Sequence, residues 1–326
     1  MGGKHGGLDI GSRGGYKLGS DNNGDPNRDK YKEDEKKIET KFKSYISKLE
    51  IRDKKIYSIN EKRYIIEEVL SQKLDITGRH IIGSYARDTM INSVEGNDVD
   101  IMIVINDRRH GDWINQPNGP MNCLQSIKRI IENDPRFKNS EVRIDKNAVT
   151  IKYEDFSIDV VPAFKDSSGG YRIPDTGKNQ SWKRTNPRMF KTVMNATDRA
   201  NDGRVSKIVK IVKGWNESNG KPLRSFHIEN MVYTHFKNQS KTETRSLTKD
   251  VENFFSRLSL YIQNPSNEPV YEERIDTYLA PKQRDTAIRK ALAAKYKIEN
   301  AKELRDKGKT EGSVNEYKKI LGEKFG

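Results

Sequence analysis

Cysteine is almost absent from this sequence, which has a single cysteine, Cys123, among 326 residues. One cysteine forms no intramolecular disulfide framework and no zinc site built from several thiolates. Histidine is also scarce, and the five histidines have no spacing typical of metal ligands. We therefore expect Cys123 to be a small apolar residue near the start of a helix, not a ligand or a crosslink.

Long apolar runs are absent as well, since the sequence has no stretch of about 18 apolar residues and does not open with a charged and then apolar leader. This composition predicts a cytoplasmic protein with no membrane partner. Positive charge is in excess, with a formal net charge of +14 and a pI near 9.5. Such a charge attracts nucleotides, nucleic acid or acidic proteins, and it does not choose among them.

The chain divides into three parts by composition. Residues 1–30 are rich in glycine and polar residues and are expected to form a disordered tail. Residues 31–190 mix helical and strand patterns, and residues 191–326 are mainly helical, so we expect a mixed α+β lobe followed by a helical lobe. Long helices are expected near 32–49 and 59–74, packed against the strands that follow.

Strand patterns dominate the middle of the first lobe. Runs rich in β-branched and apolar residues predict strands at 79–83, 98–105, 142–144, 149–153 and 156–161, with a helix at 121–132. Apolar residues at helical spacing predict helices after residue 187, at 205–215, 226–236, 251–262 and 287–304.

Three aspartates interrupt the apolar strands. Asp98 and Asp100 stand two positions apart, so strand periodicity places both on one face, where a neighbouring strand can bring Asp159 beside them. An ionised carboxylate in an apolar core costs several kcal/mol unless it is paired or holds a metal. Oxygen ligands favour Mg²⁺, which usually completes its shell with water and substrate phosphates. The arrangement predicts phosphoryl or nucleotidyl transfer.

A glycine–serine pair precedes the aspartates. Residues 81–87 read as a strand that passes through Gly83-Ser84 into a helix, where backbone N–H groups and the Ser84 hydroxyl are suited to cradle a triphosphate. Taken singly, a Gly-Ser pair is usually a turn and an Asp-x-Asp pair a solvated loop. Their order along the chain favours the functional interpretation.

These motifs resemble the polymerase-beta-like nucleotidyltransferases, with Gly83-Ser84, then Asp98-x-Asp100, then Ile158-Asp159-Val160. The resemblance narrows in two later segments, which look like the helical lobe of the cGAS/DncV-like nucleotidyltransferases of bacterial anti-phage signalling, relatives of oligoadenylate synthase. These segments are Ile211-Val212-Lys213-Gly214-Trp215-Asn216 and Ser225-Phe226-His227-Ile228-Glu229.

The resemblance implies a bilobal α+β fold, with a mixed β-sheet catalytic lobe and a helical C-terminal lobe. It implies two Mg²⁺ ions, with Mn²⁺ as an alternative, held by Asp98, Asp100 and Asp159. The nucleotide-binding residues that it implies are Gly83, Ser84, Lys213, Ser225 and Phe226. Two of these have a structural alternative, since Lys213 also fits a solvated helix lysine and Phe226 a core aromatic.

The implied activity is the joining of nucleoside triphosphates, such as ATP and GTP, into a cyclic di- or trinucleotide with release of pyrophosphate. Three alternatives stay open at this point. The chain could be an untemplated transferase acting on RNA ends or another acceptor, a linear oligonucleotide synthase, or an inactive nucleotidyltransferase fold that binds nucleic acid through its charge.

Two macromolecular partners follow from the same resemblance. A nucleic-acid activator is one, although the zinc insertion of the animal DNA sensor cannot be built with one cysteine. Some bacterial relatives are joined to other molecules at their C-terminus by ubiquitin-transfer-like enzymes, which makes Gly326 a candidate for conjugation. The plain alternative is that Gly326 is only the last residue.

Overall fold

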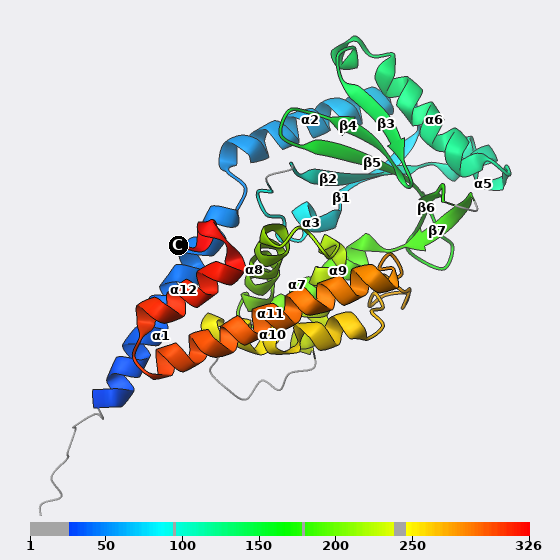
Figure 1. Cartoon of the computed structure of the whole chain (residues 1–326). Coiled ribbons are helices and arrows are strands. Elements are labelled where there is room, and N and C mark those ends of the chain that lie inside the picture. Colours follow the sequence, from blue (N-terminus) through cyan, green and yellow to red (C-terminus); the bar gives the residue numbers. More distant parts are fainter. Residues whose placement is uncertain (1–25, 94–95, 178–179, 238–245) are drawn as a thin grey trace, which may run out of the picture.

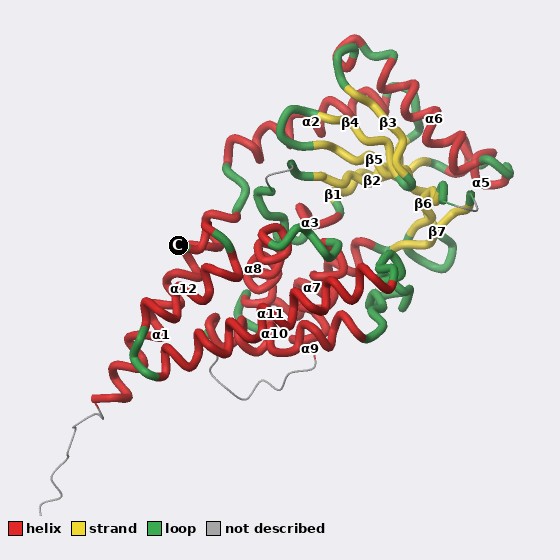
Figure 2. The backbone as a smooth tube through the Cα atoms, viewed as in Figure 1, coloured by secondary structure: helices red, strands yellow, loops and turns green. Residues whose placement is uncertain are grey.

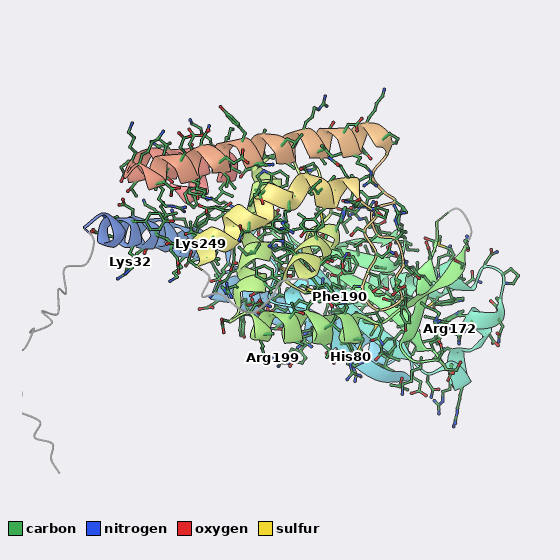
Figure 3. All side chains as sticks on the ribbon, turned by 90° about the horizontal axis from the view of Figure 1, so that it is seen from below. Lys32, His80, Arg172, Phe190, Arg199 and Lys249 are labelled. Carbon is green, nitrogen blue, oxygen red and sulfur yellow. The ribbon has the colours of Figure 1, made fainter. Side chains whose placement is uncertain are left out.

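A computed structural model describes residues 26–93, 96–177, 180–237 and 246–326. The strands gather in one lobe, the sheet lobe, and helices make up the other, the helical lobe, as the yellow and red segments of Figure 2 show. Lys32 and Arg172 lie toward opposite ends of the molecule, with Phe190 between them (Figure 3). No helix in the described part of the chain is long and apolar enough to cross a membrane.

A mixed sheet forms the centre of the sheet lobe (Figure 1). Its strands are β1 (Ile76–Ile81), β2 (Asp98–Ile105), β3 (Glu141–Asp145), β4 (Ala148–Lys152), β5 (Ser157–Lys165), β6 (Tyr171–Asp175) and β7 (Ser181–Thr185). The main path has the order β1-β2-β5-β4-β3, and β6 and β7 extend the sheet from β5. β2 and β5 are parallel, whereas the other pairs are antiparallel. The sequence patterns did not predict β6 and β7.

Two helices cover one face of this sheet. α2 (Asp53–Ser71) and α6 (Gly119–Glu132) share an apolar core with the strands, in which Ile66, Leu124 and Ile103 are fully buried. Cys123 lies in this core near the start of α6, which confirms its prediction as a small apolar residue. Short elements connect the strands, namely α3 (Gly83–Ala86), α4 (Asp107–His110), α5 (Asp112–Asn115) and η1 (Pro135–Phe137).

The helical lobe is built around α8 (Arg204–Ser218). The apolar face predicted from Val205, Ile208 and Val212 is fully buried, and Trp215 extends it. The other helices of this lobe are α7 (Pro187–Ala200), α9 (Ser225–Lys237), α10 (Leu247–Gln263), α11 (Pro281–Asp306), α12 (Thr310–Leu321) and η2 (Glu323–Phe325).

The first helix, α1 (Pro26–Leu49), packs with the helical lobe. The sequence had predicted that it packs against the strands that follow, so this prediction was wrong. Its buried Ile38, Phe42 and Leu49 share a core with α8, α10 and α12. An apolar stripe shows that one helix face is buried, but it does not specify the partner. α1 also begins inside the stretch expected to be a tail, and residues 1–25 lie outside the described residues.

The last residues of the chain pack against α1. Phe325 is 1% exposed, and its ring centroid lies 5.0 Å from that of Phe42 and 5.6 Å from that of Tyr45. Lys48 donates a hydrogen bond to the backbone oxygen of Gly326 at 2.9 Å. Gly326 is itself exposed, but its neighbours hold it in place.

Candidate active site

Two of the predicted aspartates lie opposite each other on the parallel strand pair. β2 and β5 run in register, with Asp100 opposite Asp159 and Asp98 opposite Ser157. Because side chains alternate along a strand, Asp98 and Asp100 point to the same side of the sheet. Asp98 is exposed, whereas Asp100 and Asp159 are half-buried. The strand register therefore brings the backbones of all three aspartates together.

The three carboxylates are not gathered around one point. Asp98 accepts a hydrogen bond from the Ser157 hydroxyl, and Asp159 accepts one from the Thr150 hydroxyl at 2.6 Å. Among the described residues, no three His, Cys, Asp or Glu side chains form a group that could hold a metal ion. The donor atoms suit Mg²⁺, but side-chain rotation is needed before they share one ion.

Burial and mutual repulsion disfavour the charged forms of two of these acids. Burial, followed by the charge of Asp159, raises the pKa of Asp100 to about 7, against the opposing charge of Arg87. Burial also raises the pKa of Asp159, although the hydrogen bond from Thr150 opposes this change. A raised carboxyl pKa means that the ionised form lacks sufficient positive charge nearby. A divalent cation would supply that charge, so the residues fit one.

Gly83 lies where the chain leaves β1 and enters α3. Its φ of +68° falls in the left-handed region that favours glycine. A Cβ at this position would lie 1.9 Å from Oδ2 and 2.9 Å from Cγ of Asp100, so Asp100 would have to move. The Ile82 N–H donates a hydrogen bond to the Asp100 carbonyl at 2.9 Å and fixes this approach. Glycine is therefore required for the start of α3 to lie against Asp100.

A cleft of about 720 Å³ contains every residue predicted for the site. The sheet lobe contributes Gly83, Ser84, Asp98, Asp100 and Asp159. The helical lobe contributes Lys213, Ser225 and Phe226. The volume lies within the range of small-molecule sites, which are often found where two lobes meet.

Lys213 is buried, so it is not the solvated helix lysine of the structural alternative. Only 4% of its side chain is exposed. Its Nζ donates hydrogen bonds to Oε1 of Glu229 at 2.6 Å and to the Thr89 carbonyl at 2.9 Å. Burial lowers the pKa of Lys213, although the charge of Glu229 opposes this. Lys213 therefore lines the cleft as one member of a buried ion pair.

Arg87 and Glu229 are two cleft residues that the sequence patterns did not assign to the site. Nε of Arg87 donates a hydrogen bond to Oε2 of Glu229 at 2.6 Å, and the two side chains are 6% and 0% exposed. The available signals were an arginine shortly after Gly83-Ser84 and a glutamate within the apolar pattern of α9. Neither signal shows that the two residues meet, because they are 142 positions apart.

Ser225 and Phe226 begin α9 at the edge of the cleft. Ser225 is exposed, and Phe226 is half-buried. The Phe226 ring centroid lies 4.8 Å from that of Phe190 at an interplanar angle of 57°. Phe226 thus packs on a core aromatic, as in the structural alternative, and also lines the cleft. Its stacking on a base stays a prediction.

Comparison with known proteins identifies the family. Residues 37–198 match the Second Messenger Oligonucleotide or Dinucleotide Synthetase domain. A probable cyclic nucleotide synthase of Bacillus cereus is 26% identical over 279 residues, which are 76% of this chain and 82% of that protein. The chain belongs to the cGAS/DncV-like nucleotidyltransferases. This cGAS/DncV-like nucleotidyltransferase is an enzyme of the cyclic oligonucleotide synthase type, so the alternative of an inactive nucleic-acid-binding module is set aside.

Solved structures share the fold of this cGAS/DncV-like nucleotidyltransferase. CdnC of E. coli MS115-1, solved with ATP, has a TM-score of 0.67 at 17% identity, over 89% of this chain and 98% of CdnC. The DncV cyclic AMP-GMP synthase of Vibrio cholerae, solved with a linear intermediate, has a TM-score of 0.63 at 11% identity, over 92% and 88% of the two chains. These likenesses confirm the predicted fold, a mixed sheet lobe followed by a helical lobe.

Proposed function

We propose that this enzyme joins nucleoside triphosphates into a cyclic di- or trinucleotide for anti-phage signalling and releases pyrophosphate at each joining step. One observation carries the proposal, namely that three aspartates of the sheet lobe line the same cleft as Ser84 and as Lys213 and Ser225 of the helical lobe. The relatives support the substrate class, because CdnC is solved with ATP and DncV with a linear intermediate.

Mg²⁺ fits the oxygen donors of Asp98, Asp100 and Asp159, and we propose two ions, with Mn²⁺ as an alternative. When bound, the metal would polarise phosphoryl oxygens and favour ionisation of the attacking ribose hydroxyl. The chain itself supplies the carboxylates at adjoining register positions and excludes a side chain at Gly83. The raised pKa of Asp100 reflects first its burial and then the negative charge of Asp159.

We place the donor triphosphate between the two lobes. The Ser84 hydroxyl would contact it from the sheet lobe and Ser225 from the helical lobe, while Lys213 supplies positive charge. The exposed face of Phe226 offers a surface for the base, and such stacking contributes about 1–3 kcal/mol. Positioning and charge stabilisation account for most of the catalysis in phosphoryl transfer.

Mass spectrometry of the products formed from an equimolar mixture of ATP, GTP, CTP and UTP with Mg²⁺ tests this proposal. We expect pyrophosphate release and a product that resists phosphatase, because a ring has no terminal phosphate. A product that loses terminal phosphates would favour a linear oligonucleotide synthase. Transfer of nucleotides to added RNA would favour the untemplated RNA-end alternative.

Asp100→Asn tests the metal-binding aspartates in the same assay. It removes charge from the metal-binding aspartates and should abolish turnover with the fold intact. The control is Asp202→Asn, because Asp202 is 89% exposed and lies outside the cleft. If Asp100→Asn kept more than about a tenth of the wild-type rate, a loss under ~1.4 kcal/mol, Asp100 would have no essential role.

Both macromolecular partners stay predictions. Conjugation through Gly326 requires the last residues to leave α1, because Phe325 is buried and Lys48 holds the Gly326 backbone oxygen. A nucleic-acid activator rests on the net charge of +14.

A further inference from the structure

Arg87 lies in the cleft wall beside the predicted site. It follows α3 directly and lines the same cleft as Ser84 and Asp100. Its side chain is only 6% exposed. A guanidinium stays charged even when it is buried, so the contacts of Arg87 decide where this charge acts.

The contacts of Arg87 fix the plane of its guanidinium and leave donors unused. Nε donates to Glu229 at 2.6 Å, and Cζ lies 4.9 Å from the ring centroid of Phe190 and 5.7 Å from that of Phe226. Across the described ranges, no other residue accepts a hydrogen bond from this guanidinium. A guanidinium has five N–H donors, so both Nη groups keep theirs for a ligand.

Glu229 organises the cations around it. Its carboxylate accepts hydrogen bonds from Arg87, from Lys213 at 2.6 Å and from the Thr89 hydroxyl at 2.9 Å. Burial alone would raise its pKa, but the charges of Lys213 and Arg87 hold it at about 2. Glu229 is therefore ionised at neutral pH, and its single negative charge balances one of the two positive charges. The carboxyl of Asp100 also interacts with both cations.

The same carboxylate ties the lobes together at the phosphate-binding segment. Thr89 contacts Glu229 through its hydroxyl and donates its N–H to the Ser84 carbonyl at 3.0 Å. Glu229 belongs to α9 of the helical lobe, whereas the segment from Ser84 to Thr89 belongs to the sheet lobe. One buried side chain thus holds Arg87, Lys213 and the Ser84 segment in a single arrangement.

We propose that Arg87 binds a phosphate group of the nucleoside triphosphate through its two Nη groups, and that Glu229 is the positioning residue that holds Arg87 and Lys213 in the cleft wall. The inference rests on the proposed function. The paired donors of a guanidinium edge match two phosphate oxygens, a geometry that an ammonium cannot provide. Arg87 and Lys213 line the same cleft in which a triphosphate has to approach the three aspartates.

Arg87→Met tests the binding role. The assay follows pyrophosphate release with Mg²⁺ and the four-triphosphate mixture, and KM is the total triphosphate concentration at half-maximal rate. We expect KM to rise at least ~10-fold, because a charge-assisted contact is lost. The control is Arg305→Met, since Arg305 is 1% exposed, pairs with Glu252 and lies outside the cleft, and its KM should stay within about 2-fold. A KM within about 2-fold of wild type in folded Arg87→Met overturns the proposal.

Arg87→Lys covers the case in which Arg87→Met fails to fold. Lysine keeps the positive charge beside Glu229. Its single ammonium cannot pair with Glu229 and also offer two parallel donors to a phosphate, as the planar guanidinium of arginine can. KM should again rise, by at least about 5-fold. An unchanged KM would show that Arg87 serves only to pair with Glu229.

A double-mutant cycle tests the role of Glu229. Glu229→Gln keeps the shape of the side chain but removes its charge, and it should lower kcat/KM on its own. In combination with Arg87→Met, the total loss should be at least ~10-fold smaller than the product of the two single losses. Losses that simply multiply would show that Glu229 acts independently of Arg87 and would refute its positioning role.

The outcomes separate this inference from the proposed function. A wild-type protein that releases no pyrophosphate refutes the proposed function. An active wild type with unaffected Arg87 variants refutes only the inference drawn from Arg87 and Glu229. Melting temperatures of all variants, compared with those of Arg305→Met and Glu252→Gln, separate loss of a phosphate contact from loss of a buried ion pair.

Discussion

Asp100 is the residue at which burial and charge conflict most directly. It lies between Gly83 and Asp159, and its pKa is raised from 3.8 to about 7. An acid with a raised folded-state pKa binds more protons in the folded state, so its contribution to stability falls as the pH rises from about 4 to about 7. A cation that binds the ionised carboxyl reverses this loss.

We predict that Mg²⁺ raises the melting temperature of the wild type more at pH 8 than at pH 5, because metal binds the ionised carboxyl. Asp100→Asn should melt higher than the wild type at pH 8 without Mg²⁺ and should lose most of the Mg²⁺ response. Thermal melts at both pH values measure this, with Asp202→Asn as the exposed control. An equal Mg²⁺ shift at both pH values would contradict a metal site at Asp100.

Single residues differ in how far the sequence predicts their place. The positions of Asp98, Asp100 and Asp159 on adjacent strands were predictable, because strand periodicity and a neighbouring strand are enough to bring their backbones together. The pairing of Arg87 with Glu229 was not, because it depends on how α9 packs beside α3. No local pattern encodes a contact between distant segments.

Close packing of α1 on α8 depends on a glycine. A Cβ on Gly214 would lie 2.2 Å from the Tyr45 hydroxyl oxygen and 3.0 Å from Cδ1 of Leu49. The Tyr45 hydroxyl donates a hydrogen bond to the Leu321 carbonyl at 3.1 Å. Moving the hydroxyl away from Gly214 would break this hydrogen bond. Glycine usually weakens a helix interior, and here it lets two helices approach.

Gly214→Ala should therefore destabilise the protein by about 1–3 kcal/mol, although alanine is the better helix former. Gly312→Ala in α12 is the matched control, because a Cβ there would meet Leu304 at an ordinary distance of 3.4 Å. That control should be neutral or up to ~1 kcal/mol more stable. Urea denaturation of both variants measures the difference. Equal free energies of unfolding would show that α1 tolerates a larger neighbour.

Elements were predictable where side-chain periodicity specifies them. Helices α8, α9, α10 and α11 follow apolar spacing, and each was predicted within its observed bounds. β6 and β7 were missed because charged residues and Pro174 obscure the alternation, and their pairing depends on backbone hydrogen bonds. The packing of α1 against the helical lobe was missed because its apolar stripe shows that one face is buried but does not specify which element covers that face.

At the scale of the whole molecule, the arrangement of the two lobes forms the cleft, because both lobes contribute residues to its lining. Besides Arg87 and Glu229, the Ser93 hydroxyl of the sheet lobe donates a hydrogen bond to Glu217 of the helical lobe at 2.7 Å. The net charge of +14 belongs to the chain as a whole and attracts polyanions without placing them. The position at which a polyanion binds depends on the side chains that each lobe contributes to the cleft.

The last prediction follows from this division of the site between lobes. Ser84→Ala and Ser225→Ala should each raise the KM for triphosphates by about 2–10-fold, because each removes one hydroxyl contact. The two effects should multiply in the double variant, since the serines lie on different lobes and act on the same ligand independently. Ser256→Ala on α10, outside the cleft, is the control in the pyrophosphate assay. An effect of only one serine would mean that the triphosphate contacts a single lobe and does not bridge the two.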